Sequence, residues 1–336
     1  MPQIIVENLV KHYRIVEREA GAFGAFRALT RPRYRTVAAL DGVDFSLEAG
    51  ELVGYIGPNG AGKSTTVKVL SGILVPDSGV CRVLGRVPWK ERIAHMRWIG
   101  VVFGQRSQLW WDLPVVDSFD LLRDIYAVEP GTYARTRDEL LAALDLAPLL
   151  DVPVRQLSLG QRMRCELAAS LLHSPDILFL DEPTIGLDAV SKLAVRAFIH
   201  KLNREHGVTV ILTTHDMDDI EALCSRVIVI GGGRILSDGT LDALREQVTR
   251  ERWLLIDLVD ADATVSDPDA EVLRREGDRV VLRFDPRVVD VATLIGRVTA
   301  RHAVRDLFVR NPPIEEIIAR LYGQQTAVPA GDGAAR

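Results

Sequence analysis

The sequence has few cysteines and no long apolar segment, and both absences narrow what the protein can be. Its three cysteines lie far apart without a CxxC pair, which argues against a disulfide framework or a zinc site. We expect them to be small buried side chains in a reducing compartment: Cys81, Cys165 and Cys224. No run approaches the ~18 apolar residues that cross a bilayer, and the first ten residues lack the pattern of a secretory signal. We therefore expect no segment of this sequence to cross a membrane.

An excess of basic residues is also lacking. The formal net charge is -5, whereas general nucleic-acid binders are usually basic, so the charge balance argues against that class. The 336 residues suffice for one large domain with a sizeable core and a smaller second domain.

Short apolar runs alternate with helix-like segments from about residue 40 to residue 239. Most of the runs are almost continuously apolar, as in a parallel sheet that helices cover on both faces. The runs are Leu52–Ile56, Ile177–Leu180, Val208–Thr213 and Val227–Ile230. The pattern is mostly helical between residues 117 and 172. These features predict an α/β fold with a mostly parallel sheet and a helical lobe at about residues 88–172.

The pattern changes after about residue 244. The segment Arg279–Phe284 alternates strictly, which predicts a half-exposed strand with Val281 on the opposite face from Val280. A final helix is expected after Asn311, which can cap it, with Pro312 and Pro313 in its first turn. Its apolar stripe consists of Ile314, Ile317, Ile318 and Leu321.

A glycine-rich segment follows the first of the apolar runs. It matches G-x-x-x-x-G-K-[ST] in full, with a strand before it and a helix-like run after it, so an accidental match in an ordinary turn is the weaker interpretation. In such a loop, backbone N–H groups and the following helix N-terminus surround phosphate oxygens. Lys63 would contact the outer phosphates and Ser64 would offer its hydroxyl to Mg²⁺. The predicted nucleotide-binding residues here are Gly57, Pro58, Asn59, Gly60, Ala61, Gly62, Lys63, Ser64 and Thr65.

Two carboxylates end a later apolar strand. Asp181 is expected to hold Mg²⁺, and Glu182 could polarise the attacking water as a general base. His215 ends another such strand and should emerge at the same sheet edge, where it could bind the γ-phosphate or orient the water. A lone histidine at a strand end is more often a capping or surface residue, so its role depends on the other motifs.

Four further features make the sequence similar to the ATP-binding-cassette (ABC) ATPases across roughly residues 3–240. Leu157–Gln161 resembles the LSGGQ signature of that family, and Gln105 stands where the family has its Q-loop glutamine. Ile185–Asp188 resembles the D-loop. Tyr13 stands where the family stacks an aromatic ring on adenine.

The resemblance implies that the ligands are ATP and Mg²⁺. Gln105 would then ligate Mg²⁺ and take part in hydrolysis, and the remaining ATP contacts would come from Ser158, Gly160, Gln161 and Asp188. Leu159 replaces the first glycine of the signature, which leaves the binding role in place and the effect on the turnover rate open.

The resemblance also implies a phosphate-loop cassette with an antiparallel β edge near the N-terminus. It implies, too, that two copies of the chain share each ATP site, because the signature in the helical lobe of one copy would complete the site of the other. Such a dimer would drive a separate integral membrane permease from the cytoplasmic face of the cell membrane. The details are most similar to the branch that exports drugs, polysaccharides and lipids: Glu182–Asp188, Thr213–Met217 and Asn311–Glu316. The alternatives are an importer subunit, a soluble ABC protein and a nucleotide-dependent binding module without hydrolysis. We expect no nucleic-acid partner.

Two surface segments could meet the membrane or the permease. Residues 11–35 carry seven basic and two acidic side chains, so the insertion at 14–36 could lie on inner-leaflet headgroups or on the permease, or be a solvated loop. The segment Arg106–Asp112 is either a docking surface for a permease or a packed aromatic pair under the lobe. We place the nucleotide-binding domain at 1–245 and a small α+β accessory domain at 246–323, followed by a disordered tail at 324–336.

Overall fold

A computed structural model of the chain describes residues 2–17, 33–104 and 106–326. The contacts divide the chain into two compact units, residues 1–239 and 240–336. The division falls six residues before the boundary that the sequence suggested, because β9 ends at Thr240 and a new helix begins directly after it.

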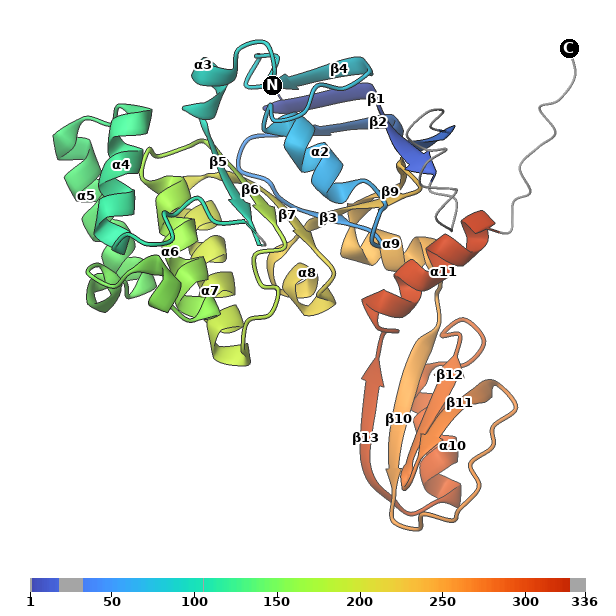
Figure 1. Cartoon of the computed structure of the whole chain (residues 1–336). Coiled ribbons are helices and arrows are strands. Elements are labelled where there is room, and N and C mark those ends of the chain that lie inside the picture. Colours follow the sequence, from blue (N-terminus) through green and yellow to red (C-terminus); the bar gives the residue numbers. More distant parts are fainter. Residues whose placement is uncertain (1, 18–32, 105, 327–336) are drawn as a thin grey trace, which may run out of the picture. The chain divides into compact units, whose positions relative to one another are not determined.

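The first unit is an α/β structure in which two sheets and several helices alternate along the chain (Figure 1). Its strands are β1 (Ile4–Glu17), β2 (Arg33–Leu47), β3 (Leu52–Ile56), β4 (Ser78–Val83), β5 (Ile99–Phe103), β6 (Ile177–Asp181), β7 (Thr209–Thr214), β8 (Arg226–Gly231) and β9 (Arg234–Thr240). Its helices are α2 (Lys63–Leu70), α3 (Arg92–Met96), α4 (Val115–Tyr126), α5 (Pro130–Leu144), α6 (Leu159–Leu171), α7 (Ala189–His206) and α8 (Met217–Leu223), with short 3₁₀ turns at Ala147–Leu149 and Val154–Gln156.

The larger sheet has the order β5-β6-β7-β3-β8-β9, and the pairs from β5 to β8 are parallel. The four apolar runs identified in the sequence are β3, β6, β7 and β8, which confirms the parallel core. The smaller sheet has the order β2-β1-β4 and is antiparallel, as expected for the N-terminal edge. The carboxyl ends of the parallel strands therefore meet at one edge, where chemical groups can gather.

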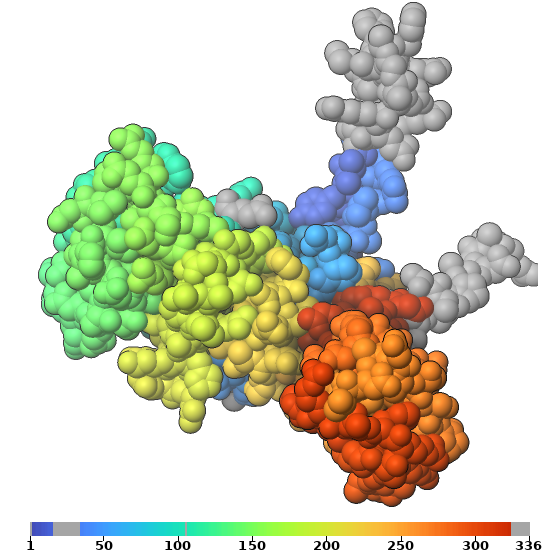
Figure 2. All heavy atoms as spheres, turned by 90° about the horizontal axis from the view of Figure 1, so that it is seen from below, coloured from blue at the N-terminus to red at the C-terminus, as the bar shows by residue number. Residues whose placement is uncertain are grey.

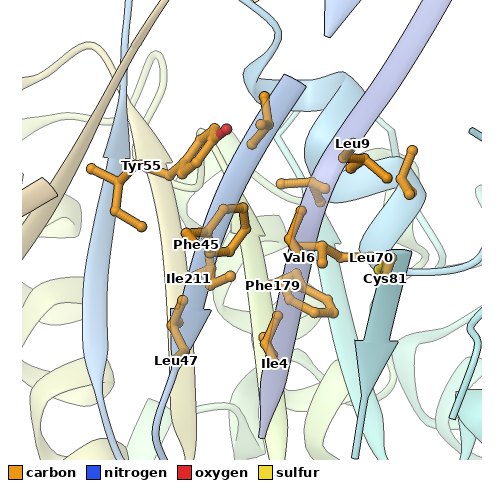
Figure 3. Close-up of a cluster of buried hydrophobic side chains, with 14 of the residues drawn as sticks. Ile4, Val6, Leu9, Phe45, Leu47, Tyr55, Leu70, Cys81, Phe179 and Ile211 are labelled. Atoms are coloured by element: carbon orange, nitrogen blue, oxygen red, sulfur yellow. The ribbon is translucent and has the colours of Figure 1, made fainter. Parts of the chain in front are cut away.

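The main core lies between the two sheets and around α2 (Figure 3). Phe45 of β2 and Tyr55 of β3 contact each other there with ring centroids 5.8 Å apart. Phe179 of β6 and Leu70 of α2 are also fully buried in this cluster. All three cysteines are buried and free, as predicted, and burial raises the pKa of each thiol.

The helical lobe contains α4, α5 and α6, but its predicted start at residue 88 was too early. Residues 99–103 form β5, which pairs in parallel with β6 at the edge of the large sheet. A five-residue apolar run cannot be distinguished from a buried helical segment by periodicity alone, which explains the misassignment. In the residues that the structure describes, no helix is both long and apolar enough to span a membrane.

The second unit contains a four-stranded antiparallel sheet of order β11-β12-β10-β13, with α10 packed against one face (Figure 1). Its elements are α9 (Leu241–Val248), β10 (Arg252–Leu258), β11 (Ala270–Glu276), β12 (Arg279–Phe284), α10 (Val291–Arg301), β13 (Val304–Arg310) and α11 (Ile314–Thr326). The predicted strand Arg279–Phe284 has the predicted bounds. On its second face Val281 is buried beside Trp253 and Leu255, whereas Arg279 and Arg283 stay partly exposed.

The last helix begins at Ile314, after the two prolines that were expected in its first turn, so it starts two residues later than predicted. Its predicted apolar stripe is buried. The helix extends to Thr326, so the first three residues of the predicted tail are helical, whereas 327–336 lie outside the described residues. The central part of the basic insertion, 18–32, is also outside them.

Candidate functional site

The phosphate loop connects β3 to α2 at the carboxyl edge of the parallel sheet (Figure 1). A β-carbon on Gly57 would lie 2.3 Å from the carbonyl oxygen of Ile230. A β-carbon on Gly62 would lie 2.5 Å from the carbonyl oxygen of Ala39, and Gly62 has a φ of +117°, which side chains rarely permit. These glycines are therefore required for the path of the loop, and the loop leads into the N-terminus of α2. Of the other predicted residues, Pro58, Asn59 and Gly60 are exposed, Ala61 is buried, and Ser64 and Thr65 are half-buried.

Lys63 is the first residue of α2, and its side chain folds back over the loop. Its Nζ donates hydrogen bonds to the carbonyl oxygens of Gly57 at 2.7 Å and Pro58 at 3.2 Å. Burial lowers the pKa of Lys63, while the carboxylates of Glu182 and Asp181 oppose this shift. The ammonium is thus held where phosphates bound by the loop would meet it.

Asp181 ends β6 and faces α2. Its Oδ1 accepts hydrogen bonds from Ser64 Oγ at 3.2 Å and from Thr213 Oγ1 at 2.5 Å. A hydroxyl and a carboxylate are oxygen ligands of the kind that Mg²⁺ prefers, together with phosphate and water. The described residues contain no group of three or more His, Cys, Asp or Glu that could hold a metal ion without such additional ligands. The third predicted ligand, Gln105, lies outside the described residues.

Glu182 and His215 come together at the ends of neighbouring strands. Glu182 Oε1 lies 3.5 Å from His215 Nδ1, and the two side chains are 21% and 58% exposed. Glu182 has a φ of 57°, a left-handed conformation that costs a non-glycine residue about 1–2 kcal/mol. Its N–H donates to the Thr213 carbonyl oxygen at 2.9 Å. Strained backbone of this kind is concentrated at functional sites, which agrees with a role for this pair in chemistry.

The signature segment forms the N-terminus of α6. Ser158 caps the helix: its Oγ accepts from the Gln161 N–H at 3.2 Å, and Gln161 Oε1 accepts from the Ser158 N–H at 2.9 Å. Such a reciprocal capping box stabilises a helix start by about 1 kcal/mol. Ser158 and Leu159 remain exposed, while Gly160 is buried. The N-terminus of α6 is therefore capped within its own chain, and its first residues, Ser158 and Leu159, are exposed.

The D-loop segment lies against the start of α6. Asp188 caps α7, accepting from the Ser191 N–H at 2.9 Å and from the Ser191 hydroxyl at 2.7 Å, and these bonds lower its pKa. A β-carbon on Gly160 would lie 2.3 Å from Ser191 Oγ, and one on Gly186 would lie 3.0 Å from Leu159 Cδ2. Leu159, which replaces a glycine in the resemblance, thus packs onto the D-loop segment of its own chain.

The remaining predicted contacts lie on separate surfaces of the first unit. Tyr13 is half-buried on β1 beside Lys11, whose Nζ lies 6.0 Å from the ring centroid. Trp110 and Trp111 are 39% and 53% exposed, which favours a surface role over a packed aromatic pair for the segment Arg106–Asp112. Arg162 of α6 lies over the Trp111 ring at 5.9 Å.

Three residues that hold the site together were assigned no role from the sequence. Thr213 binds Asp181 as described above, while Thr184 and Thr214 both donate to the buried carboxylate of Asp219. All three lie in segments that the family resemblance picked out, Glu182–Asp188 and Thr213–Met217. The shared partner of Thr184 and Thr214 in α8 is apparent only from the fold.

The sequence is similar to those of ATP-binding proteins from several bacteria. A family model described as "ABC transporter" matches residues 40–185. The daunorubicin resistance ATP-binding protein DrrA3 of Streptomyces coeruleorubidus is 34% identical, over 88% of this chain and 95% of the relative. The Nod factor export ATP-binding protein I of Ralstonia nicotianae is 34% identical, over 88% and 92%. The methionine import ATP-binding protein MetN of Latilactobacillus sakei is 30% identical, over 84% and 85%.

Among solved structures, the chain resembles a dimeric post-hydrolysis state of the ATP-binding cassette MJ0796 bound to ADP and phosphate. The TM-score is 0.58 at 26% sequence identity, over 71% of this chain and 98% of that chain. The similarity covers the cassette and agrees with the phosphate loop and the strand ends described above.

Proposed function

We propose that two copies of this chain enclose ATP and power a separate membrane permease that exports its cargo. The chain belongs to the ATP-binding subunits of ABC transporters, and it is an ATP hydrolase. The observation that carries the hydrolytic part is the convergence of Lys63, Asp181, Glu182 and His215 at one sheet edge. These groups come from three separate parts of the sequence, and the parallel sheet brings them together.

The proposed chemistry assigns one task to each group. The phosphate loop and Lys63 bind and orient the phosphates. Ser64 and Asp181, with Gln105, would hold Mg²⁺, which offsets the charge of the phosphate oxygens. Glu182 takes a proton from the attacking water, and His215, 3.5 Å from Glu182, orients that water or the γ-phosphate. Replacing Glu182 with Gln should therefore abolish hydrolysis and leave ATP binding in place.

The shared site is supported by the exposure of the signature. One chain carries one phosphate loop and one signature, and the exposed Ser158 caps a helix whose free N–H groups suit an anion from a second copy. Asp188 lies beside this helix start and would approach the same interface, and Tyr13 would stack on the adenine in its own chain. ATP would then bind the two copies together, and hydrolysis would release them.

Export is favoured over import by the names of two similar proteins, one a resistance protein and one an export protein. An importer subunit is the second candidate, since a methionine import protein is also similar. The exposed Trp110 and Trp111, next to the Q-loop position, would form the docking surface for the permease, which would hold the chain at the cytoplasmic face of the membrane.

The hairpin of β1 and β2 is a second proposed contact with the membrane. Figure 2 shows it standing out from the first unit, and Ile15 and Tyr34 near its outer end are 54% and 59% exposed beside Arg14 and Arg35. Apolar and basic side chains together suit an anionic lipid surface.

Sedimentation with anionic liposomes tests this contact. Binding should fall when Arg14 and Arg35 are both replaced by Gln. The control exchanges the exposed Arg92 and Arg97, which carry the same charge elsewhere on the unit. Equal binding by both double variants would contradict the lipid contact.

Pull-down of the tagged chain from gently solubilised native membranes tests the transporter assignment. We expect a stoichiometric partner with several membrane spans, and its identity would point to the cargo. Recovery from the soluble fraction alone, or with nucleic acid, would instead favour a soluble ABC protein and leave the ATPase chemistry unaffected.

A further inference from the structure

The side chain of Asp219 in α8 is completely buried although it is charged, and its hydrogen bonds lead toward the hydrolytic site. Its Oδ2 accepts from the hydroxyl of Thr184 and, at 3.3 Å, from the hydroxyl of Thr214. Its Oδ1 accepts from Nε of Arg196 in α7. A buried carboxylate needs such partners, because an unpaired charge in the interior is very costly.

The two threonines are the neighbours of the two proposed hydrolytic residues. Thr184 comes two positions after Glu182, and Thr214 comes one position before His215. One carboxylate oxygen of Asp219 thus connects the segment after β6 to the end of β7. Both threonines are 2% exposed, so these bonds are shielded from water.

Asp216, the residue directly after His215, is also held by hydrogen bonds and ion pairs. The N–H of Asp216 donates to Thr214 Oγ1 at 2.9 Å, which leaves the Thr214 hydroxyl hydrogen for Asp219. The carboxylate of Asp216 pairs with Lys192 and lies 3.6 Å from Arg196. His215 therefore stands between two residues that are both tied into one network.

Such support is needed because the working side chains are themselves only partly packed. Glu182 and His215 are 21% and 58% exposed, and Glu182 holds a left-handed backbone conformation. Neighbours that determine the backbone on both sides can keep a strained residue in place. Reacting groups that are misplaced by about 1 Å can lose about 100-fold in rate, so the spacing of this pair matters.

We propose that Asp219 is a positioning residue that sets the separation of Glu182 and His215 through the hydroxyls of Thr184 and Thr214. It does so without contact with the nucleotide. The inference rests on the hydrolytic roles proposed above for Glu182 and His215.

Thr184 and Thr214 allow a test that separates hydrogen bonding from packing. Replacing both by Val keeps the shape and removes the hydroxyls, while replacing both by Ser keeps the hydroxyls and removes the methyl groups. We expect the Val pair to lower kcat for ATP hydrolysis by about tenfold or more, with KM for ATP within about twofold of the wild type. The Ser pair should keep kcat within about threefold of the wild type.

Thr209→Val is the matched control. Thr209 is also buried, lies on the same strand β7 and uses its hydroxyl to bind the Gly50 N–H at 2.8 Å and the side chain of Gln3 at 2.6 Å, at the other end of the strand. Its loss should also lower thermal stability but leave kcat within about twofold.

The outcomes distinguish this inference from the proposed function. If the Val pair keeps the kcat of Thr209→Val, or if the Ser pair loses as much as the Val pair, Asp219 does not position the site through these hydroxyls. Glu182→Gln serves as the reference in the same assay. If that variant hydrolyses ATP at the wild-type rate, the proposed role of Glu182 itself is wrong.

Discussion

Acidification should destabilise the first unit through His173, which lies where the helical lobe meets the parallel sheet. Its Nε2 donates to the Ile99 carbonyl oxygen of β5 at 2.9 Å, and its ring stacks on Tyr126 of α4 at 3.9 Å between centroids. Its Nδ1 is buried and has no hydrogen-bond partner in the described part of the chain. A second proton would therefore be placed on a nitrogen that water cannot reach, and this burial lowers the pKa of His173 from 6.5 to about 4.

Because folding lowers the pKa of His173, the free energy of unfolding should fall as the pH falls. As the pH falls below 6.5, the unfolded chain takes up the proton first, while the folded chain resists until about pH 4. The stabilising contribution is complete above pH 6.5 and is lost between pH 6.5 and about 4. Between pH 7 and pH 5 the free energy of unfolding should fall by about 2 kcal/mol from this group.

Urea unfolding of the wild type and of His173→Phe, followed by tryptophan fluorescence, measures this contribution. Phenylalanine keeps the stack on Tyr126 and cannot be protonated. Because His95, whose pKa burial also lowers, is present in both proteins, its effect cancels in the comparison. The stability advantage of the wild type should shrink by about 2 kcal/mol from pH 7 to pH 5. A difference that stays constant within about 0.5 kcal/mol would refute the argument.

Three further predictions concern the nucleotide site and its partners. Gly57→Ala would place a β-carbon 2.3 Å from the Ile230 carbonyl oxygen. Thermal unfolding should therefore show a free energy of unfolding lower by about 1–3 kcal/mol, and calorimetry should show a weaker affinity for ATP. An unchanged affinity would contradict the account of the loop. Lys63→Ala and Ser158→Ala chains should each be inactive alone, yet an equal mixture should recover about a quarter of the wild-type ATPase rate, because half of the dimers hold one intact site. No recovery would mean that the sites are not shared. Trp111→Ala should reduce the amount of permease that copurifies from membranes, and equal copurification would exclude this surface as the contact.

The fold was largely predictable where a short segment of sequence carries a clear pattern of its own. The buried parallel strands were recognised because they are nearly all apolar, and the phosphate loop because its glycines and Lys63 form a specific pattern. β5 was assigned to the helical lobe because a short apolar run carries no periodicity. The burial of Val281 in β12 was missed because Trp253 and Leu255, which cover it, come from another strand.

The site was predictable residue by residue but not as an arrangement. Asp181, Glu182 and His215 were identified from their motifs, yet the left-handed backbone of Glu182 follows from its surroundings. The role of Asp219 depends on the way that β6, β7 and α8 come together, and pairings across long stretches of sequence leave no local pattern. Capping by Ser158 and Asp188 is the opposite case, because each side chain bonds an N–H group only three residues along the chain.

The central claim is that two copies of the chain share each ATP site. Its most direct test is the molar mass of the Glu182→Gln variant in saturating MgATP, measured by size-exclusion chromatography with light scattering. Because this variant should bind ATP without hydrolysing it, the account predicts a stable dimer in MgATP and a monomer in MgADP. A monomer that carries bound ATP would contradict the shared site.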